Sequence, residues 1–266
     1  MRLEGKVAVI FGGGQAPGET IGNGRATAVL FAREGARVAV VDRDLASAEE
    51  TVAMVTAEGG EAFAVAADVV VEAEVRAAIE AAVAHWGQID ILHNNVGISV
   101  AGNDAPVEEI TTEAFDRIVA VNLRGMVYSC KHALPIMRAQ GSGVILNISS
   151  MAARTGYPWV GYKTTKAAVI GLTEQLALQN ARFGIRANAI LPGLMDTPMA
   201  VDTRARTFSP PRAEVAAERD AQVPLRRKMG TGWDVGYAAL YLASDEANFI
   251  TGVSLPVDGG AGVRVG

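Results

Sequence analysis

A tyrosine and a lysine stand four positions apart at the start of an Ala-rich segment, in the order Tyr162-Lys163-Thr164-Thr165-Lys166. Residues i and i+4 lie on the same face of a helix, so both side chains are expected to point into the same space. A tyrosine hydroxyl has a reference pKa of about 10 and is a poor base at neutral pH unless a nearby cation favours the phenolate. Lys166 can supply that cation, so the pair could move a proton to or from an oxygen atom.

A glycine-dense turn follows the apolar run Val7–Phe11 and precedes a segment with helical spacing. Glycine allows close approach to a ligand, and the free N–H groups and dipole of a helix start favour an anionic phosphate. Pro17 occupies the third glycine position of the usual Gly-x-Gly-x-x-Gly pattern, whereas Gly18-x-x-x-Gly22-Asn23-Gly24 gives a different spacing. The position of the turn between a strand and a helix still indicates a dinucleotide site.

An acidic residue, Asp42, ends the second apolar run, 18 residues past Gly24. A carboxylate at this point can accept hydrogen bonds from the adenosine ribose hydroxyls and repel an additional 2′-phosphate. We therefore expect NAD rather than NADP, although the neighbouring Arg43 leaves a route to phosphate binding.

Short apolar runs alternate with Ala-rich helical segments along nearly the whole chain, which predicts a single doubly wound Rossmann-type α/β domain, with about seven parallel strands and helices on both faces. The expected strands are Val7–Phe11, Val38–Val41, Ala62–Ala66, Ile89–Leu92, Val144–Ile148, Ile185–Ile190 and Val253–Val257. The expected helices are Arg25–Glu34, Leu45–Glu58, Glu72–Trp86, Thr112–Ala139, Tyr162–Phe183 and Trp233–Ser244.

The composition of the 266 residues narrows the partners and the class of protein. A net charge of −5 disfavours nucleic acid as the main partner, and half of the residues are apolar, which supplies an extensive core. The longest apolar run, residues 237–243, is far shorter than the roughly 20 residues of a membrane span. The single Cys130 fits a reducing cytoplasm, and the three histidines lack metal-ligand spacing, so we expect no metal site.

One irregular segment, Pro198–Pro224, lies between the sixth expected strand and the last expected helix. A long connection inside a compact α/β domain is usually functional, so residues 198–224 are expected to form a lid over the substrate.

Further motifs occur in a fixed order: Gly22-Asn23-Gly24, Asp68-Val69, Asn94-Asn95-Val96-Gly97, Val121-Asn122, Asn147-Ile148-Ser149-Ser150, Tyr162-x-x-x-Lys166, and Pro192-Gly193 followed by Thr197. In this order they are highly specific, and the sequence from Leu3 to Gly260 resembles the short-chain dehydrogenase/reductase family. The resemblance implies hydride transfer between the nicotinamide C4 and a carbinol or carbonyl carbon.

Four residues carry the implied proton transfer: Asn122, Ser150, Tyr162 and Lys166. Tyr162 would be the general acid/base, and Lys166 would lower its pKa and hold the nicotinamide ribose. Ser150 would hydrogen-bond the substrate oxygen, and Asn122 would position a water that links Lys166 to solvent.

The resemblance also implies a cofactor-binding set in which Asp68 and Val69 meet the adenine and Thr197 reaches the carboxamide or the pyrophosphate. The full expected set is Gly12, Gln15, Thr20, Ile21, Gly22, Asn23, Gly24, Asp42, Arg43, Asp68, Val69, Asn95, Val96, Gly97, Tyr162, Lys166, Pro192, Gly193, Met195 and Thr197.

The chain departs from the family pattern in three places. Phe11 replaces the usual threonine before Gly12, and the glycine loop is longer than usual, so phosphate contacts could come from its own residues Gln15, Thr20 or Ile21. Ser150 precedes Tyr162 by 12 positions, one fewer than is common, while Ser149 precedes it by 13. Strand register favours Ser150 as the reacting serine.

The substrate is not identified by the sequence. Tyr157, Trp159 and Met199 could line its pocket, as could Val96 and Met195, and core packing is nearly as good an explanation for each. A pocket of these residues would suit a medium or bulky secondary alcohol or ketone.

Two other functions stay open, an enoyl reductase-like enzyme and an NAD-sensing binding protein without turnover. The Tyr162–Lys166 spacing argues against the first, and the intact proton-transfer set argues against the second. The resemblance implies a homotetramer built on the segments 112–139 and 162–183 and on the last strand.

Overall fold

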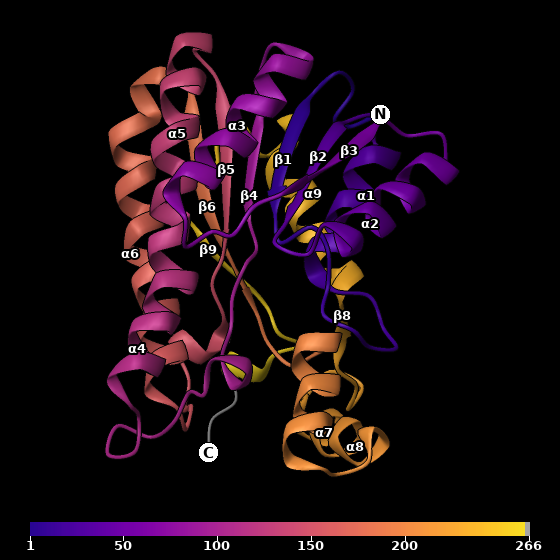
Figure 1. Ribbon diagram of the computed structural model, residues 1–266, viewed down its shortest axis with the longest axis vertical. Helices are drawn as coiled ribbons and strands as arrows, with labels where there is room; N and C mark the ends of the chain where they lie inside the picture. Colours follow the sequence, from indigo (N-terminus) through magenta and orange to yellow (C-terminus); the bar gives the residue numbers. More distant parts are fainter. Residues whose placement is uncertain (264–266) are drawn as a thin grey trace.

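The computed structural model describes residues 1–263, and its centre is a sheet of seven parallel strands in the order β3-β2-β1-β4-β5-β6-β9 (Figure 1). The strand order reverses direction between β1 and β4, which is where open α/β sheets bind their ligands. The predicted fold class is confirmed. The strands are β1 (Val7–Phe11), β2 (Arg37–Asp42), β3 (Ala62–Ala66), β4 (Ile91–Asn94), β5 (Gly143–Ile148), β6 (Ile185–Pro192) and β9 (Ser254–Val257).

Helices cover both faces of this sheet because its central strands are apolar on both sides. Every residue of β1 and β5 is buried. One apolar core lies between the sheet and α1, α2 and α9, and a second lies between the sheet and α3, α5 and α6. The helices are α1 (Asn23–Arg33), α2 (Leu45–Ala57), α3 (Glu72–Trp86), α4 (Thr112–Val119), α5 (Gly125–Gln140), α6 (Val160–Asn180), α7 (Thr203–Phe208), α8 (Arg212–Gln222) and α9 (Gly232–Ala243).

The segment 198–224 is helical, so the expectation of an irregular chain there was wrong. It contains a π-helical turn (Pro198–Asp202), α7 and α8, and it has its own apolar cluster of Val201, Val215, Val223 and Met229. Pro198 and Pro211 do not break these helices, because they stand at helix starts, where proline needs no N–H partner, and Pro224 follows the end of α8. We call residues 198–224 the lid segment. A short parallel pair, β7 (Met195–Asp196) and β8 (Gly230–Thr231), closes its base.

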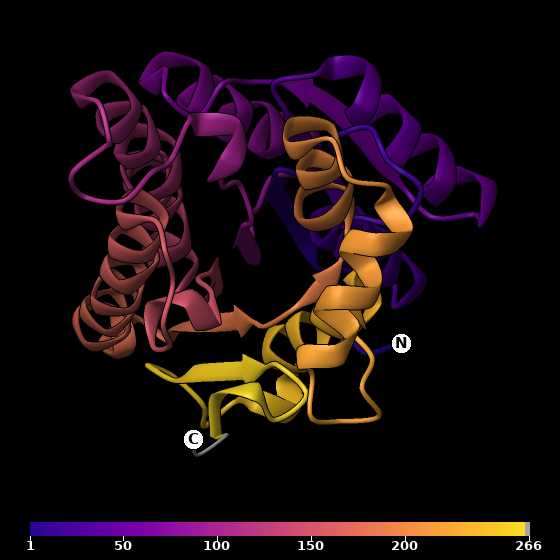
Figure 2. The same cartoon turned by 90° about the horizontal axis from the view of Figure 1, so that it is seen from below.

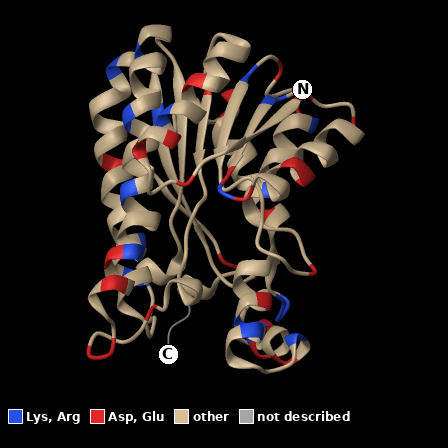
Figure 3. Ribbon diagram, in the orientation of Figure 1, with Lys and Arg blue, Asp and Glu red and all other residues tan. Residues whose placement is uncertain are grey.

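The predicted helix over residues 112–139 is divided into α4 and α5 by a π-helical segment, Ala120–Arg124. Figure 2, which looks toward the carboxyl ends of the strands, shows α7 and α8 in orange beside the indigo glycine turn. Acidic and basic residues are interspersed on α8, whereas the charged residues of α7 are both arginines (Figure 3). No helix within residues 1–263 combines the length and the apolar character needed to cross a membrane.

Candidate active site

The carboxyl edge of the sheet brings Tyr162 and Lys166 together on the first turns of α6, which begins at Val160. The Lys166 side chain is buried, with its Nζ 5.6 Å from the centre of the Tyr162 ring and donating a hydrogen bond to the Ile148 carbonyl at 2.7 Å. Burial lowers the pKa of Lys166 to about 7. The lysine therefore changes charge near neutral pH.

The Tyr162 hydroxyl lies in a low-dielectric environment, and burial raises its pKa to about 12, with the neighbouring Tyr157 acting in the same direction. The hydroxyl of Ser150 and the guanidinium groups of Arg204 and Arg219 lower this pKa. Burial thus keeps the Tyr162 hydroxyl protonated at neutral pH, while Ser150 and the two arginines are groups that can stabilise its phenolate.

Ser149 and Ser150, which follow β5, have different partners. The Ser149 hydroxyl donates to the Lys166 carbonyl at 2.7 Å and therefore braces α6. The Ser150 hydroxyl accepts from the Ala152 amide at 3.1 Å, and it is the serine that interacts with Tyr162. This geometry favours Ser150 as the serine beside the reacting oxygen.

Asn122 lies inside the π-helical segment, a feature that often marks functional sites. Its Oδ1 accepts from the Ile98 amide at 2.7 Å, and its Nδ2 donates to the Ile98 carbonyl at 2.9 Å and to Thr165 at 3.2 Å. Both amide hydrogens are therefore used within the protein. The side chain fixes the loop after Gly97 against α6, and a Cβ on Gly97 would lie 3.0 Å from the Lys166 Nζ.

An acidic residue that the sequence motifs did not single out, Asp104, holds the start of α6. Its carboxylate accepts from the Gly161 and Tyr162 amides, both at 2.8 Å. A carboxylate at a helix N-terminus satisfies free N–H groups and interacts favourably with the dipole. Asp104 belongs to a loop far from Tyr162 in sequence, so no local pattern reveals the contact.

The glycine turn between β1 and α1 has the close approach that a dinucleotide requires. A Cβ on Gly24 would lie 1.9 Å from the Gly12 carbonyl, and Gly12 itself has a φ of +78°. The Asn95 side chain braces the turn by donating to that carbonyl at 2.9 Å. No side chain caps α1, whose N-cap is Gly22, so its first N–H groups face outward without a side-chain acceptor. These residues fit a cofactor diphosphate.

The extended part of the glycine loop bonds to the protein itself. The Gln15 side chain accepts from the Gly22 amide at 2.9 Å and donates to the Thr20 carbonyl at 3.3 Å. The Ile21 carbonyl packs against Gly232 at the start of α9. Gln15 and Ile21 therefore shape the loop, whereas the Oδ1 of Asn23 is buried and has no hydrogen-bond partner among residues 1–263.

The same loop also contacts the lid segment. The Glu19 amide donates to Asp202 at 3.3 Å, the Thr20 hydroxyl lies 3.5 Å from Asp196, and Arg206 donates to the Pro17 carbonyl at 2.9 Å. Arg212 joins the same group through ion pairs with Glu19, Asp196 and Asp202. The lengthened glycine loop is thus bonded to residues 198–224, the segment predicted to be a lid.

Asp42 ends β2 with its carboxylate turned back toward the glycine turn. It accepts from the Gly14 amide at 3.1 Å and from the Asp44 amide at 3.2 Å, and burial raises its pKa. Arg43 is exposed. Arg25, which sequence reasoning did not single out, is buried and donates to Thr51 and Ser47, so it ties α1 to α2 beneath the turn.

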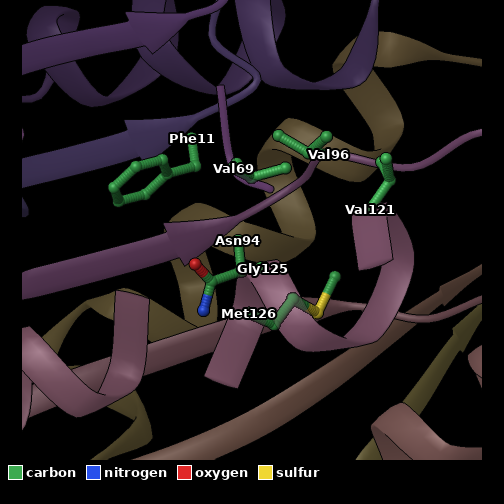
Figure 4. A pocket seen from close by; sticks show the side chains of 7 residues that line it. All are labelled: Phe11, Val69, Asn94, Val96, Val121, Gly125 and Met126. Carbon is green, nitrogen blue, oxygen red and sulfur yellow. The ribbon is translucent and has the colours of Figure 1, made fainter. Parts of the chain in front are cut away.

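One of the two predicted adenine contacts, Val69, and the predicted cofactor-binding residue Val96 border a small pocket at the ends of β1 and β4 (Figure 4). Val69 and Val96 reach it from separate loops, while the Asp68 carboxylate accepts from the Val70 amide and fixes the loop that carries Val69. The pocket is lined by Phe11, Val69, Asn94, Val96, Val121, Gly125 and Met126.

The predicted residues after β6 fall into two groups. Gly193 packs against Asp258, where a Cβ would lie 2.7 Å from the Asp258 Cα, and Pro192 is the last residue of β6. Thr197 is buried and its hydroxyl accepts from the Ala200 amide at 3.4 Å, so it caps the first turn of the lid segment. Met195 belongs to the apolar core with α9, so the structure favours core packing over pocket lining for this side chain.

Two of the three predicted substrate residues lie beside Tyr162. The Tyr157 ring lies 5.4 Å from the Tyr162 ring and 5.6 Å from the Trp159 ring, measured between centres. Tyr157 also bonds Ser99 at 3.1 Å. Met199 is exposed on the lid segment.

Comparison with known proteins agrees with this geometry. Residues 19–262 match a family model described as enoyl-(acyl carrier protein) reductase. The chain is 37% identical to levodione reductase of Leifsonia aquatica, over 97% of this chain and 95% of that protein, and 39% identical to sorbitol dehydrogenase of Cereibacter sphaeroides, over 98% of both chains.

A crystal structure from Burkholderia xenovorans, described as that of a short-chain dehydrogenase/reductase, superposes with a TM-score of 0.89 at 39% identity, covering 100% of this chain and 99% of that one. The chain therefore belongs to the short-chain dehydrogenase/reductase family of oxidoreductases.

Proposed function

We propose that this oxidoreductase interconverts a secondary alcohol and its ketone with NAD as cofactor, with Tyr162 as the general acid/base. The observation that carries the proposal is the group of half-buried Tyr162 with buried Lys166 and Ser150, at the sheet edge that also holds the glycine turn. Relatives named as a reductase of levodione and a dehydrogenase of sorbitol support the alcohol–ketone chemistry.

Tyr162, Lys166 and Ser150 have different roles in the proposed proton transfer. A bound nicotinamide supplies hydride acceptance or donation. Tyr162, whose pKa burial raises to about 12, holds a proton at neutral pH that it can give to a ketone oxygen. In the oxidative direction its pKa has to fall, and the cationic form of Lys166 and the hydroxyl of Ser150 favour the phenolate. Asn122 holds the loop beside Lys166 in place.

The residues of the glycine turn, with Asp42 at the end of β2, are assigned to the dinucleotide. The N–H groups at the start of α1 would meet the diphosphate, and the Asp42 carboxylate would bond the adenosine ribose and repel a 2′-phosphate. These groups support NAD over NADP.

We further propose a homotetramer in the cytoplasm. Large apolar side chains are exposed on the helices expected at the interfaces: Phe115 on α4, Val127 on α5 and Leu178 on α6. The single Cys130, whose pKa burial raises to about 12, supports a reducing compartment and no thiol chemistry. Sedimentation velocity would detect monomers or dimers if the assembly is wrong.

The test is turnover of a panel of secondary alcohols and ketones with NAD(H) and NADP(H), followed by the absorbance of the reduced nicotinamide. Tyr162→Phe should abolish turnover and leave the Kd for NAD nearly unchanged, whereas Tyr237→Phe, at an exposed position on α9, should change neither turnover nor the Kd. Retained turnover in Tyr162→Phe contradicts the assignment. Reduction of an enoyl thioester but of no ketone would favour an enoyl reductase, and cofactor binding without any turnover would favour a sensor.

A further inference from the structure

Two arginines of the lid segment reach the aromatic group beside Tyr162. Arg204 on α7 donates one hydrogen bond to the Ala200 carbonyl at 2.8 Å, and its Nη2 lies 3.5 Å from the Tyr157 hydroxyl. Its guanidinium carbon lies 5.7 Å from the centre of the Trp159 ring. The stacking and the backbone bond hold this cation in a fixed orientation against Tyr157, which is itself in contact with Tyr162.

Arg219 on α8 lies near enough to Tyr157, Tyr162 and Asp196 for its charge to interact with all three. Its Nε is buried and has no hydrogen-bond partner, and the structure from residue 1 to residue 263 gives its guanidinium no ion pair. Asp220, the next residue in sequence, pairs with Lys228, and Asp196 and Asp202 pair with Arg212 on the same helix. Buried donors without acceptors are rare in folded proteins, because each costs free energy.

The two cations act on each other and on the reacting tyrosine. Burial, and after it the charge of Arg204, lowers the pKa of Arg219 to about 10. Both guanidinium groups in turn lower the pKa values of Tyr157 and Tyr162. Two guanidinium groups that repel each other beside a reaction site favour an anion that interacts with both, and a guanidinium fork matches the geometry of a carboxylate.

We propose, resting on the alcohol–ketone function above, that the substrate is a hydroxy acid or keto acid whose carboxylate is bound by Arg219 and Arg204 while its reacting carbon lies at Tyr162. Arg219 supplies the free donors, and Arg204 adds charge and a donor held in place by Trp159. Another anion, the cofactor diphosphate, has the same chemistry, and the experiment separates the two sources.

The experiment compares matched acids and amides. 4-Oxopentanoate and 4-acetylbenzoate, each beside its primary amide, are tested for binding by calorimetry on the NAD-loaded protein and for reduction with NADH. The proteins are the wild type, Arg219→Gln, Arg204→Gln, and Arg227→Gln as a control that removes an exposed arginine of the same region. Circular dichroism checks that each variant is folded.

We expect at least one acid to bind about ten- to hundredfold more tightly than its amide, the range of charge-assisted hydrogen bonds. The preference for the acid should disappear in Arg219→Gln, weaken in Arg204→Gln and persist in Arg227→Gln. In the first two variants the KM for the acid should rise more than kcat falls. Equal binding of acid and amide to the wild type overturns the inference, as does a preference that survives in Arg219→Gln.

Loss of NAD affinity in Arg219→Gln with an unchanged acid-to-amide ratio also overturns it, and assigns the arginines to the cofactor. The proposed function fails in a different way. If acids bind selectively but no ketone is reduced and no alcohol is oxidised, anion recognition stands and the alcohol–ketone chemistry is wrong.

Discussion

Replacing Lys166 by methionine should make the protein more stable at neutral pH while it abolishes activity. The side chain is 2% exposed, and burial lowers its pKa from 10.5 to about 7, so the folded state disfavours the charged form. A shift of this size means that Lys166 lowers the free energy of unfolding by about 4–5 kcal/mol at pH 7 or below, because each pKa unit is worth about 1.4 kcal/mol. Methionine has a similar length and carries no charge.

The sign of the pH dependence follows from proton binding. Between the folded pKa near 7 and the unfolded value of 10.5, the unfolded state binds the proton and the folded state does not. The free energy of unfolding of the wild type, relative to Lys166→Met, therefore rises with pH in this range. The cost of Lys166 falls from about 4 kcal/mol at pH 7 to about 2 kcal/mol at pH 9.

The methionine variant leaves the Ile148 carbonyl without its donor, which costs about 1–3 kcal/mol at either pH. At pH 7 the variant should still be more stable by about 1–3 kcal/mol, and at pH 9 the advantage should be lost. Urea unfolding without cofactor at both pH values measures this, with Lys228→Met as the control. The exposed Lys228 pairs with Asp220, which raises its pKa, so its removal cannot gain stability in the same way. If the free energies of unfolding of the wild type and of Lys166→Met differ by the same amount at pH 7 and at pH 9, the reasoning is refuted.

Three further perturbations test separate parts of the structure. Asp42→Asn keeps an acceptor for the Gly14 amide and removes the charge, so the ratio of kcat/KM for NADP to that for NAD should rise about tenfold or more. Arg212→Gln cuts the ion pairs to Asp196 and Asp202, so amide hydrogen exchange should accelerate in residues 12–22 and 198–224 together; an effect confined to one segment would contradict the anchoring. Burial lowers the pKa of His93 to about 3, so on acidification from pH 6.5 to pH 5 the wild type should lose about 2 kcal/mol of unfolding free energy that His93→Gln keeps.

The sequence predicted the parts of the site that depend on local spacing. Tyr162 and Lys166 share a helix face because four residues make about one turn, and the strand ends were visible because buried strands are rich in Val and Ile. Asp104 and Arg219 could not be found in this way. Their significance depends on where the chain returns in space, and a single acid in a loop or one arginine on a charged helix has no distinctive pattern.

The errors have physical causes as well. Pro198 and Pro211 indicated an irregular segment, yet both stand at helix starts that tolerate proline. The division of the helix over residues 112–139 follows from Asn122, which bonds the backbone of Ile98 and makes room for the π-helical segment. Its partner lies in another loop, so helical periodicity alone predicts an uninterrupted helix.

The length of the glycine loop and the position of the lid segment are linked by the contacts between them. The loop is too long to serve only as a phosphate turn, and its additional residues hold the lid through Pro17 and Glu19, which contact Arg206 and Asp202. The lid in turn carries Arg204 and Arg219 to the tyrosines. A shorter loop would still allow a phosphate to approach α1, but it would leave α7 and α8 without these anchors. The unusual loop is therefore understood through the lid it holds, and its length belongs to the substrate side of the site as much as to the cofactor side.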